Sequence, residues 1–451
     1  MSGPATMRLP SPLAALRARL LAEARNEATR GAALSLAIKI AMSALNLVML
    51  TLIARALAGH EFGTFALWYN ALVFLTVVAG LGQEKMILRQ WGEYAATREW
   101  GLARGSLGFG AAVTGAGAAL AALAVLAVGH LSGSDPHLAL AGAAFLVVQT
   151  LFFFTAHINR AMLGVVQGVI HELTWRAVVI AAMAAFLILH RTGTATEFFV
   201  VATIGMGIGL LAQLIAIRHG LPAELRTTPR LTQRRAWARR SLPMAMGGNL
   251  EAATQYLEVF VVGLVLSPAA AGAYFVAARI ANLFLMISGG MDAFTTRQIP
   301  RQFYGEGRGA VAGTLRRLAL IVSAPVLVGL LGIVLFGRPI LSIFGEGFVA
   351  SYGVLVALSV GTAILALAGP AMPVLTLTGH EGTYSLVLGA TLALRLSALI
   401  AGAWFWGPMG AAVASAAGAA VTAVALNLAC RRTVGLDPAV TSLLALGRIR
   451  P

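Results

Sequence analysis

The uncharged stretch LALIVSAPVLVGLLGIVLF, residues 318–336, decides the fold class of this chain. A helix needs about 20 apolar residues to cross the hydrocarbon core of a bilayer. Eleven further runs are long and apolar enough to do the same, at 31–55, 62–82, 102–128, 138–157, 168–189, 197–217, 243–266, 272–293, 351–371, 384–404 and 409–429. The sequence therefore predicts an all-α polytopic membrane protein with about 12 transmembrane helices.

The composition agrees with a chain that is mostly surrounded by lipid. The 451 residues are 59% hydrophobic and 11% charged, with a mean hydropathy of +0.83, whereas about 25% of the residues of a soluble domain are charged. The polar connections between the runs are short, so no soluble catalytic domain is expected. The chain contains no Walker phosphate-binding loop, no complete zinc-protease motif and a single cysteine, Cys430. We expect no catalytic residue, metal site, cofactor or internal disulfide.

The positive charges alternate between the two sides of the predicted membrane helices. Connections on the side of the N-terminus hold 27 Lys and Arg residues, whereas those on the other side hold two, Arg191 and Arg338. Basic residues accumulate on the cytoplasmic side of membrane proteins, which predicts that both termini are cytoplasmic. The same bias explains the net charge of +16, so no nucleic-acid partner is expected.

The longest basic connection divides the chain into two halves. We predict a basic cytoplasmic tail at 1–30, with an amphipathic helix on the membrane surface, and a second cytoplasmic tail at 430–451. Between them lie six-helix bundles at 31–217 and 243–429, joined by a cytoplasmic linker at 218–242.

Two short stretches repeat between these halves. The stretch LAGHEFGTF at 57–65 and the stretch LSPAAAGAY at 266–274 share a leucine, a glycine and an aromatic residue at a constant offset of 209 positions. Because each half holds an even number of spans, the halves have the same orientation and are related by an axis along the membrane normal. Two like halves around a central cavity are typical of transporters.

Polar side chains inside the spans mark the candidate cavity. A charged side chain at the membrane centre costs about 2.5–3.5 kcal/mol on insertion scales, so it normally faces protein or water. Spans one, seven and eight each carry such residues at helical spacing, and span eleven carries one more. The candidates are Lys39, Asn46, Glu251, Gln255, Glu258, Arg279, Asn282 and Arg395.

Two alternatives concern these charges. Lys39 and Arg279 could serve only as buried ion-pair partners of Glu251 and Glu258, and Arg395 could extend to the membrane interface instead of facing a cavity. Glu172 and Arg176 are four residues apart on one helix, and a local ion pair explains them.

The chain resembles the polysaccharide biosynthesis flippases, the Wzx-type branch of the multidrug/oligosaccharidyl-lipid/polysaccharide (MOP) exporter superfamily. The motifs that carry the resemblance are ARAL at 54–57 with EFGTF at 61–65, GLG at 80–82, AGAYF at 271–275 with AAR at 277–279, and LTG at 377–379. Each motif is loose, but together with the six-plus-six arrangement they extend the resemblance over residues 31–430.

This resemblance implies a flippase in the bacterial inner membrane that moves undecaprenyl-diphosphate-linked oligosaccharides outward for O-antigen, capsule or exopolysaccharide synthesis. Arg279 matches the family's arginine in span eight, and Lys39 corresponds to a basic position in span one. The expected partners are the lipid-linked oligosaccharide, membrane lipids, and a polysaccharide polymerase with its chain-length regulator.

We expect alternating access by rocking of the two halves. Lys39 and Arg279 would bind the diphosphate with Arg395 as a third cation, and Asn46, Gln255 and Asn282 would bind sugar hydroxyls. Glu251 or Glu258 would carry a coupling proton or sodium ion, and the membrane potential would contribute.

Two other functions fit the same chain. A MATE-like antiporter of organic cations would need a net acidic cavity, whereas the candidate cavity is balanced or basic. A non-transporting scaffold of a polysaccharide assembly complex would have little reason to keep charges inside its spans.

Overall fold

The computed structural model describes residues 27–57 and 59–443, and all the regular structure within them is helical. The predicted tail at 1–30 falls almost entirely outside this part of the chain. The chain divides into two compact units, residues 1–48 and 49–451. Of the first unit, the structure describes the beginning of one helix, α2 (Glu27–Leu57), which ends in the second unit.

The second unit contains the remaining helices. The first half of the chain provides α3 (Gly59–Gly80), α4 (Gln83–Ala96), α5 (Trp100–Leu131), α6 (Pro136–Leu163), α7 (Val165–Ile170), α8 (Glu172–Ile188) and α9 (Ala195–Gly220). The second half provides α10 (Arg234–Val265), α11 (Pro268–Ala281), α12 (Leu283–Gly305), α13 (Arg308–Phe344), α14 (Tyr352–Leu367), α15 (Ala371–Leu377) and α16 (Glu381–Thr433). Short 3-10 turns occupy Ala223–Arg226, Glu346–Ser351 and Val440–Leu443.

Nine helices in the described part are long and apolar enough to cross a membrane. The predicted spans 384–404 and 409–429 lie together in α16, which is interrupted at Trp406 and at Gly407, where φ is +62°. A left-handed φ of this kind suits glycine, and Pro408 follows it. The predicted spans 31–55 and 243–266 correspond to α2 and α10. The apolar part of α2, Ala41–Leu57, is short, and α10 carries two glutamates in its middle.

Three helices begin with capping residues at the places where the sequence predicts external connections. The Asp135 side chain accepts a hydrogen bond from the His137 backbone at the start of α6, and Ser267 caps α11 in the same way. Thr194 and Glu197 form a reciprocal capping box at the start of α9. These caps satisfy backbone N–H groups that have no partner within the helix.

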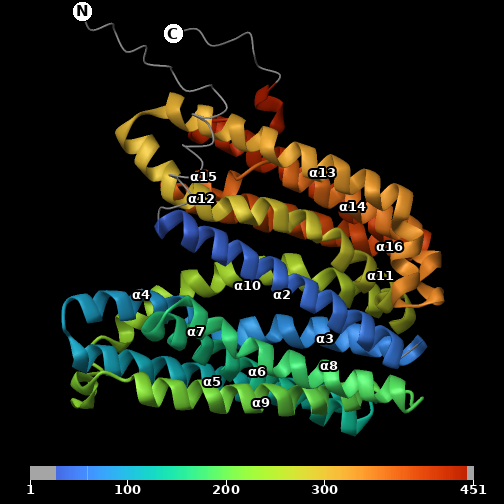
Figure 1. Cartoon of the computed structure of the whole chain (residues 1–451), viewed down its shortest axis with the longest axis horizontal. Helices are drawn as coiled ribbons and strands as arrows, with labels where there is room; N and C mark the ends of the chain where they lie inside the picture. Colours follow the sequence, from blue (N-terminus) through green and yellow to red (C-terminus); the bar gives the residue numbers. More distant parts are fainter. Residues whose placement is uncertain (1–26, 58, 444–451) are drawn as a thin grey trace, which may run out of the picture. The chain divides into compact units, whose positions relative to one another are not determined.

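The repeated glycines lie against each other where the two halves meet. α3 packs against α10 and α11 (Figure 1). A Cβ atom added to Gly63 would lie 2.2 Å from the Pro268 carbonyl oxygen, and one added to Gly272 would lie 3.1 Å from the Gly63 Cα. Phe275 packs beside them in tilted or edge contact with Phe62 and Phe65. Small residues let helix backbones approach closely inside a membrane, so the sequence repeat marks the contact between the halves.

α10 begins at Arg234, inside the predicted linker at 218–242. This linker lies against the first half. The Arg230 backbone N–H donates to the Gly101 carbonyl at 2.8 Å. Trp237 is completely buried and donates through Nε1 to the Tyr94 hydroxyl at 2.8 Å.

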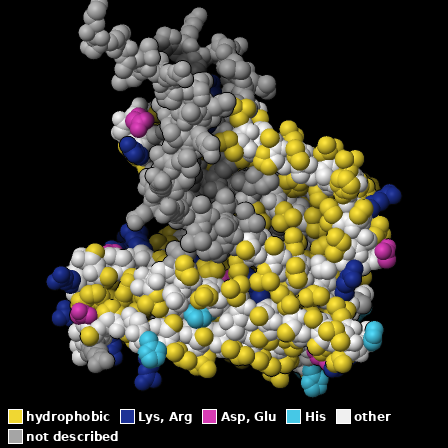
Figure 2. All heavy atoms as spheres, viewed as in Figure 1, with side chains coloured by type: hydrophobic (Ala, Val, Ile, Leu, Met, Phe, Trp, Pro, Cys, Tyr) yellow, Lys and Arg dark blue, Asp and Glu magenta, His cyan; other side chains and the backbone are white. Residues whose placement is uncertain are grey.

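Apolar side chains cover most of the visible face of the described helices, and most Lys and Arg side chains lie toward its ends (Figure 2). On α13, for example, Val328 is 70% exposed and Leu335 is 62% exposed. Exposed apolar area on this scale indicates contact with lipid. The chain is a multi-pass membrane protein, as the sequence predicts.

Candidate functional site

A buried ion pair joins α10 to α16. Arg395 Nε lies 2.5 Å from Glu258 Oε1, without the alignment of a hydrogen bond. The two side chains are only 10% and 9% exposed. Removing two charges from water costs several kcal/mol per ion, which close geometry and further hydrogen bonds must offset.

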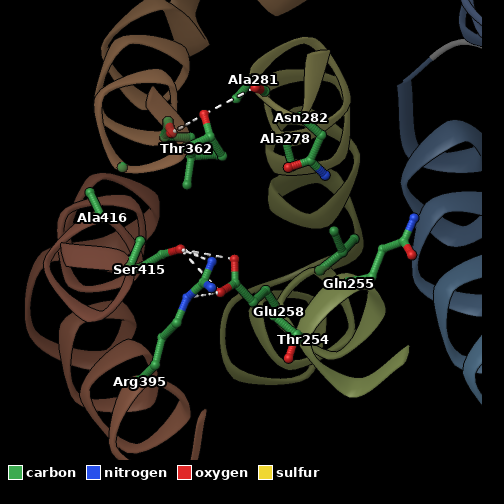
Figure 3. A pocket seen from close by; sticks show the side chains of 14 residues that line it. Thr254, Gln255, Glu258, Ala278, Ala281, Asn282, Thr362, Arg395, Ser415 and Ala416 are labelled. Carbon is green, nitrogen blue, oxygen red and sulfur yellow. Dashed lines mark hydrogen bonds and ion pairs between the residues drawn. The ribbon is translucent and has the colours of Figure 1, made fainter. Parts of the chain in front are cut away.

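Two hydroxyl groups supply these further hydrogen bonds. Ser415 Oγ accepts from Arg395 Nη2 at 2.9 Å and donates to Glu258 Oε2, also at 2.9 Å. The Tyr274 hydroxyl donates to Glu258 Oε2 at 3.1 Å. Arg395, Glu258 and Ser415 converge in Figure 3. The carboxylate is therefore held by two hydroxyl donors, Tyr274 from α11 and Ser415 from α16, and by the ion pair with Arg395.

A small cavity of about 40 Å³ opens beside this network, between α10, α11, α14 and α16. Its polar lining consists of Thr254, Gln255, Glu258, Asn282, Thr362, Arg395 and Ser415. A cavity needs a volume of at least about 10–15 Å³ to hold one water molecule. The cavity can therefore hold water or a small cation next to Glu258, but it is far too small for an oligosaccharide.

Four of the eight predicted site residues line this cavity, namely Gln255, Glu258, Asn282 and Arg395. Figure 3 shows the Gln255 side chain pointing away from the Glu258 carboxylate. Arg395 does not extend to the membrane interface, because it is buried and paired with Glu258. The sequence analysis considered other cations as partners of Glu258 and an interfacial position for Arg395. Neither of these alternatives includes the pair of Glu258 and Arg395.

Glu251 and Arg279 lie outside the cavity lining. Glu251 Oε2 is 3.1 Å from Lys85 Nζ, and both side chains are more than 40% exposed. The Arg279 guanidinium lies 4.9 Å from the Phe275 ring centroid and 5.5 Å from the Tyr256 ring centroid, which is a favourable cation–π geometry. The suggestion that Arg279 pairs with Glu251 or Glu258 is therefore wrong for the described residues.

Lys39 and Asn46 belong to the first unit, so the structure does not place them relative to this cavity. The placement of the Lys39 side chain lies outside the part that the structure describes, and Asn46 is exposed. The ion pair between Glu172 and Arg176 is confirmed at 3.0 Å.

Sequence reasoning missed three functional candidates. Tyr274 lies within the repeated stretch but was interpreted only as part of the repeat. Ser415 is a single hydroxyl in an Ala- and Gly-rich run, and Lys85 falls in a predicted connection. The spacing of polar residues within one helix cannot reveal partners that come from other helices.

The helical fold and the buried polar network together define a multi-pass membrane protein that keeps a charged pair between its helices. The model of the polysaccharide biosynthesis protein family matches residues 28–297, more than half of the sequence. The chain belongs to this family. No curated protein sequence matches the chain closely enough to count as a relative.

Several solved structures share this fold. A multidrug resistance MATE family transporter of the MOP superfamily, in an inward-facing conformation, is similar with a TM-score of 0.68 and 15% identity, over 90% of this chain and 96% of that one. The lipid II flippase MurJ, in an inward closed conformation, is similar with a TM-score of 0.66 and 13% identity, over 90% and 91%. The Vibrio cholerae MATE transporter VcmN in its bent form has a TM-score of 0.53 and 15% identity, over 92% and 99%.

Proposed function

We propose that the chain moves undecaprenyl-diphosphate-linked oligosaccharides across the bacterial inner membrane for surface polysaccharide synthesis. The family match supports the polysaccharide role, and the likeness to a lipid II flippase supports a lipid-linked cargo. The observation that carries the mechanism is the buried pair of Glu258 and Arg395 inside the membrane. Intramembrane charges are expensive and are normally tied to transport.

Glu258 is the better candidate for ion coupling. It is buried and faces a cavity that can hold water or a small cation, whereas Glu251 forms an exposed pair with Lys85. Protonation of Glu258 would remove its charge and leave Arg395 unpaired. The buried arrangement would then lose the attraction that offsets the burial of the arginine. Loading and release of one cation could therefore change the packing between α10 and α16.

Arg279 is the candidate for contact with the diphosphate. Among the described residues its guanidinium has no carboxylate partner and lies on two aromatic rings near the contact between the halves. A cation held in this way can bind a phosphate without first breaking an ion pair. Lys39, on the membrane helix that precedes α3, would add a second positive charge.

Complementation in a bacterium that lacks its own copy of this gene tests the proposal. Wild-type protein should restore surface polysaccharide, and Arg279→Ala should not, although it should reach the membrane in normal amount. Arg191→Ala is the matched control, since Arg191 pairs with Glu197 outside the predicted substrate pathway. Normal surface polysaccharide in cells with Arg279→Ala would contradict the proposed contact of Arg279 with the diphosphate. Normal polysaccharide in the strain without the gene would contradict the function.

The likeness to a multidrug MATE transporter supports cation-coupled drug export as a second candidate. It predicts that cells expressing the protein extrude a cationic dye such as ethidium and that Glu258→Gln abolishes the extrusion. The flippase proposal predicts no extrusion in the same cells.

A further inference from the structure

A long apolar groove runs along the first half, away from the Glu258 cavity. α5 and α9 each pack along α6 but make little contact with each other. The groove between them has a volume of about 950 Å³. Its walls and floor include Leu107 on α5, Phe154 and Ile158 on α6, and Leu214 and Ile217 on α9. This volume is at the upper end of small-molecule sites, and the lining suits hydrocarbon chains.

One end of the groove is closed by the basic linker. Leu221 and Leu225 from this linker complete the lining, and Arg104 and Arg218 lie on the same rim. Arg104 Nη1 donates to the Thr227 carbonyl at 2.5 Å, which fixes the guanidinium beside the linker. Both arginines are exposed, and neither forms an ion pair with a carboxylate among the described residues. The groove is therefore apolar along its length and cationic at one end.

We propose that this groove binds an anionic phospholipid of the surrounding bilayer, with its acyl chains between α5 and α9 and its phosphate at Arg104 and Arg218. Basic pockets between membrane helices at a membrane interface recognise anionic lipid head groups. The charge bias of the sequence predicts that this interface is cytoplasmic.

The position of the groove favours a bilayer phospholipid over the transported cargo. No residue lines both the groove and the Glu258 cavity, and α6 forms the floor of the groove on the side of α3. The occupant therefore contacts the first half and the linker but not α10 to α16. The linker connects the two halves, and its residues Leu221 and Leu225 line the groove. The bound lipid would therefore hold this part of the linker against the first half.

Gly108 provides a direct test because it lines the groove and a Cβ atom there would meet nothing within 4 Å. Gly108→Leu should place a side chain in the groove from a backbone position where the Cβ itself meets no protein atom. Gly332 on α13 is equally open and lies in the other half, so Gly332→Leu is the matched control. Arg218→Gln removes charge from the rim without adding volume.

The experiment uses the purified, delipidated full chain and two lipids with identical acyl chains, anionic phosphatidylglycerol and zwitterionic phosphatidylcholine. Melting temperature and the lipid retained in native mass spectrometry are measured for each protein. Wild type and Gly332→Leu should retain phosphatidylglycerol and gain a higher melting temperature from it than from phosphatidylcholine. Gly108→Leu should lose this difference, and Arg218→Gln should weaken phosphatidylglycerol binding about fivefold.

Four results would overturn the proposal. Equal effects of the two lipids on wild type would indicate unspecific contact, and a full phosphatidylglycerol effect in Gly108→Leu would place the lipid elsewhere. Displacement of phosphatidylglycerol by an equal amount of polyprenyl phosphate would assign the groove to the tail of a lipid-linked cargo. If Gly108→Leu does not fold, Arg218→Gln decides: unchanged phosphatidylglycerol binding contradicts the proposal.

Discussion

Removing Arg395 should destabilise the protein by several kcal/mol, because it leaves the Glu258 carboxylate buried without a cation. The two side chains are only 10% and 9% exposed, and the charged atoms are 2.5 Å apart. Breaking a buried ion pair at one partner typically costs about 3–5 kcal/mol. Tyr274 and Ser415 would still donate to the carboxylate, so we expect Arg395→Met to lie at the lower end of this range, about 3 kcal/mol.

A double-mutant cycle separates the pair from the packing around it. Glu258→Gln should also destabilise the protein, because the buried guanidinium then has no carboxylate partner and keeps its hydrogen bond to the Ser415 hydroxyl. In Glu258→Gln/Arg395→Met both charges are gone, so the double variant should be more stable than the sum of the single effects predicts. Coupling energies between contacting residues run to about 0.5–3 kcal/mol, and we expect the upper part of this range.

The assay is the free energy of unfolding from titration with a denaturing detergent in mixed micelles. Lys85→Met is the matched control, since it removes the partner of Glu251 from a pair that is 44% and 42% exposed. Exposed pairs contribute about 0–1 kcal/mol. Losses below about 1 kcal/mol for Arg395→Met, or single effects that simply add in the double variant, would refute the account of a tight buried pair.

The contact between the halves, the orientation of the chain and the buried ion pair each give one further prediction. Gly63→Ala should lower stability by about 1–3 kcal/mol, because the new Cβ would lie 2.2 Å from a backbone oxygen of α11. Gly207→Ala, where the new Cβ lies in open space, should leave stability unchanged. Equal melting temperatures of the two variants would contradict the close contact. Gly347→Cys in the turn after α13 should react with a membrane-impermeant maleimide on intact cells, and Thr228→Cys in the linker should react only after permeabilisation. The native Cys430 is buried, so background labelling should be low, and the reverse pattern would overturn the orientation. Glu258→Gln/Arg395→Met should insert and fold yet lose transport, and a fully active double variant would exclude the pair from ion coupling.

The fold could be predicted from the sequence because each span carries its own signal. An apolar run such as 318–336 identifies a membrane helix without reference to the rest of the chain. The repeat of Gly63 at Gly272 predicted two like halves, but that both glycines lie at the contact between them, where a close backbone approach excludes side chains, came only from the structure. The break at Gly407 could be anticipated only as a gap between two apolar runs.

The partners within the site could not be predicted in the same way. Helical spacing placed Glu251, Gln255 and Glu258 on one face, but the structure pairs Glu251 with α4 and Glu258 with α16. Which helix lies opposite a given residue depends on how the helices pack, and the spacing of residues within one helix does not reveal this. Arg395 illustrates the limit, because its position deep in a span fits both an interfacial and a buried side chain.

The most direct test of the central claim is translocation by the purified protein in liposomes. A polyprenyl-diphosphate-linked oligosaccharide is placed in the outer leaflet, and its sugar is probed over time with an impermeant oxidant. Wild type should protect part of the sugar by moving it inward, whereas with Arg279→Ala the sugar should stay as accessible as in empty liposomes. No protection by wild type under an imposed proton or sodium gradient, together with transport of ethidium in the same liposomes, would contradict the account and favour a drug exporter.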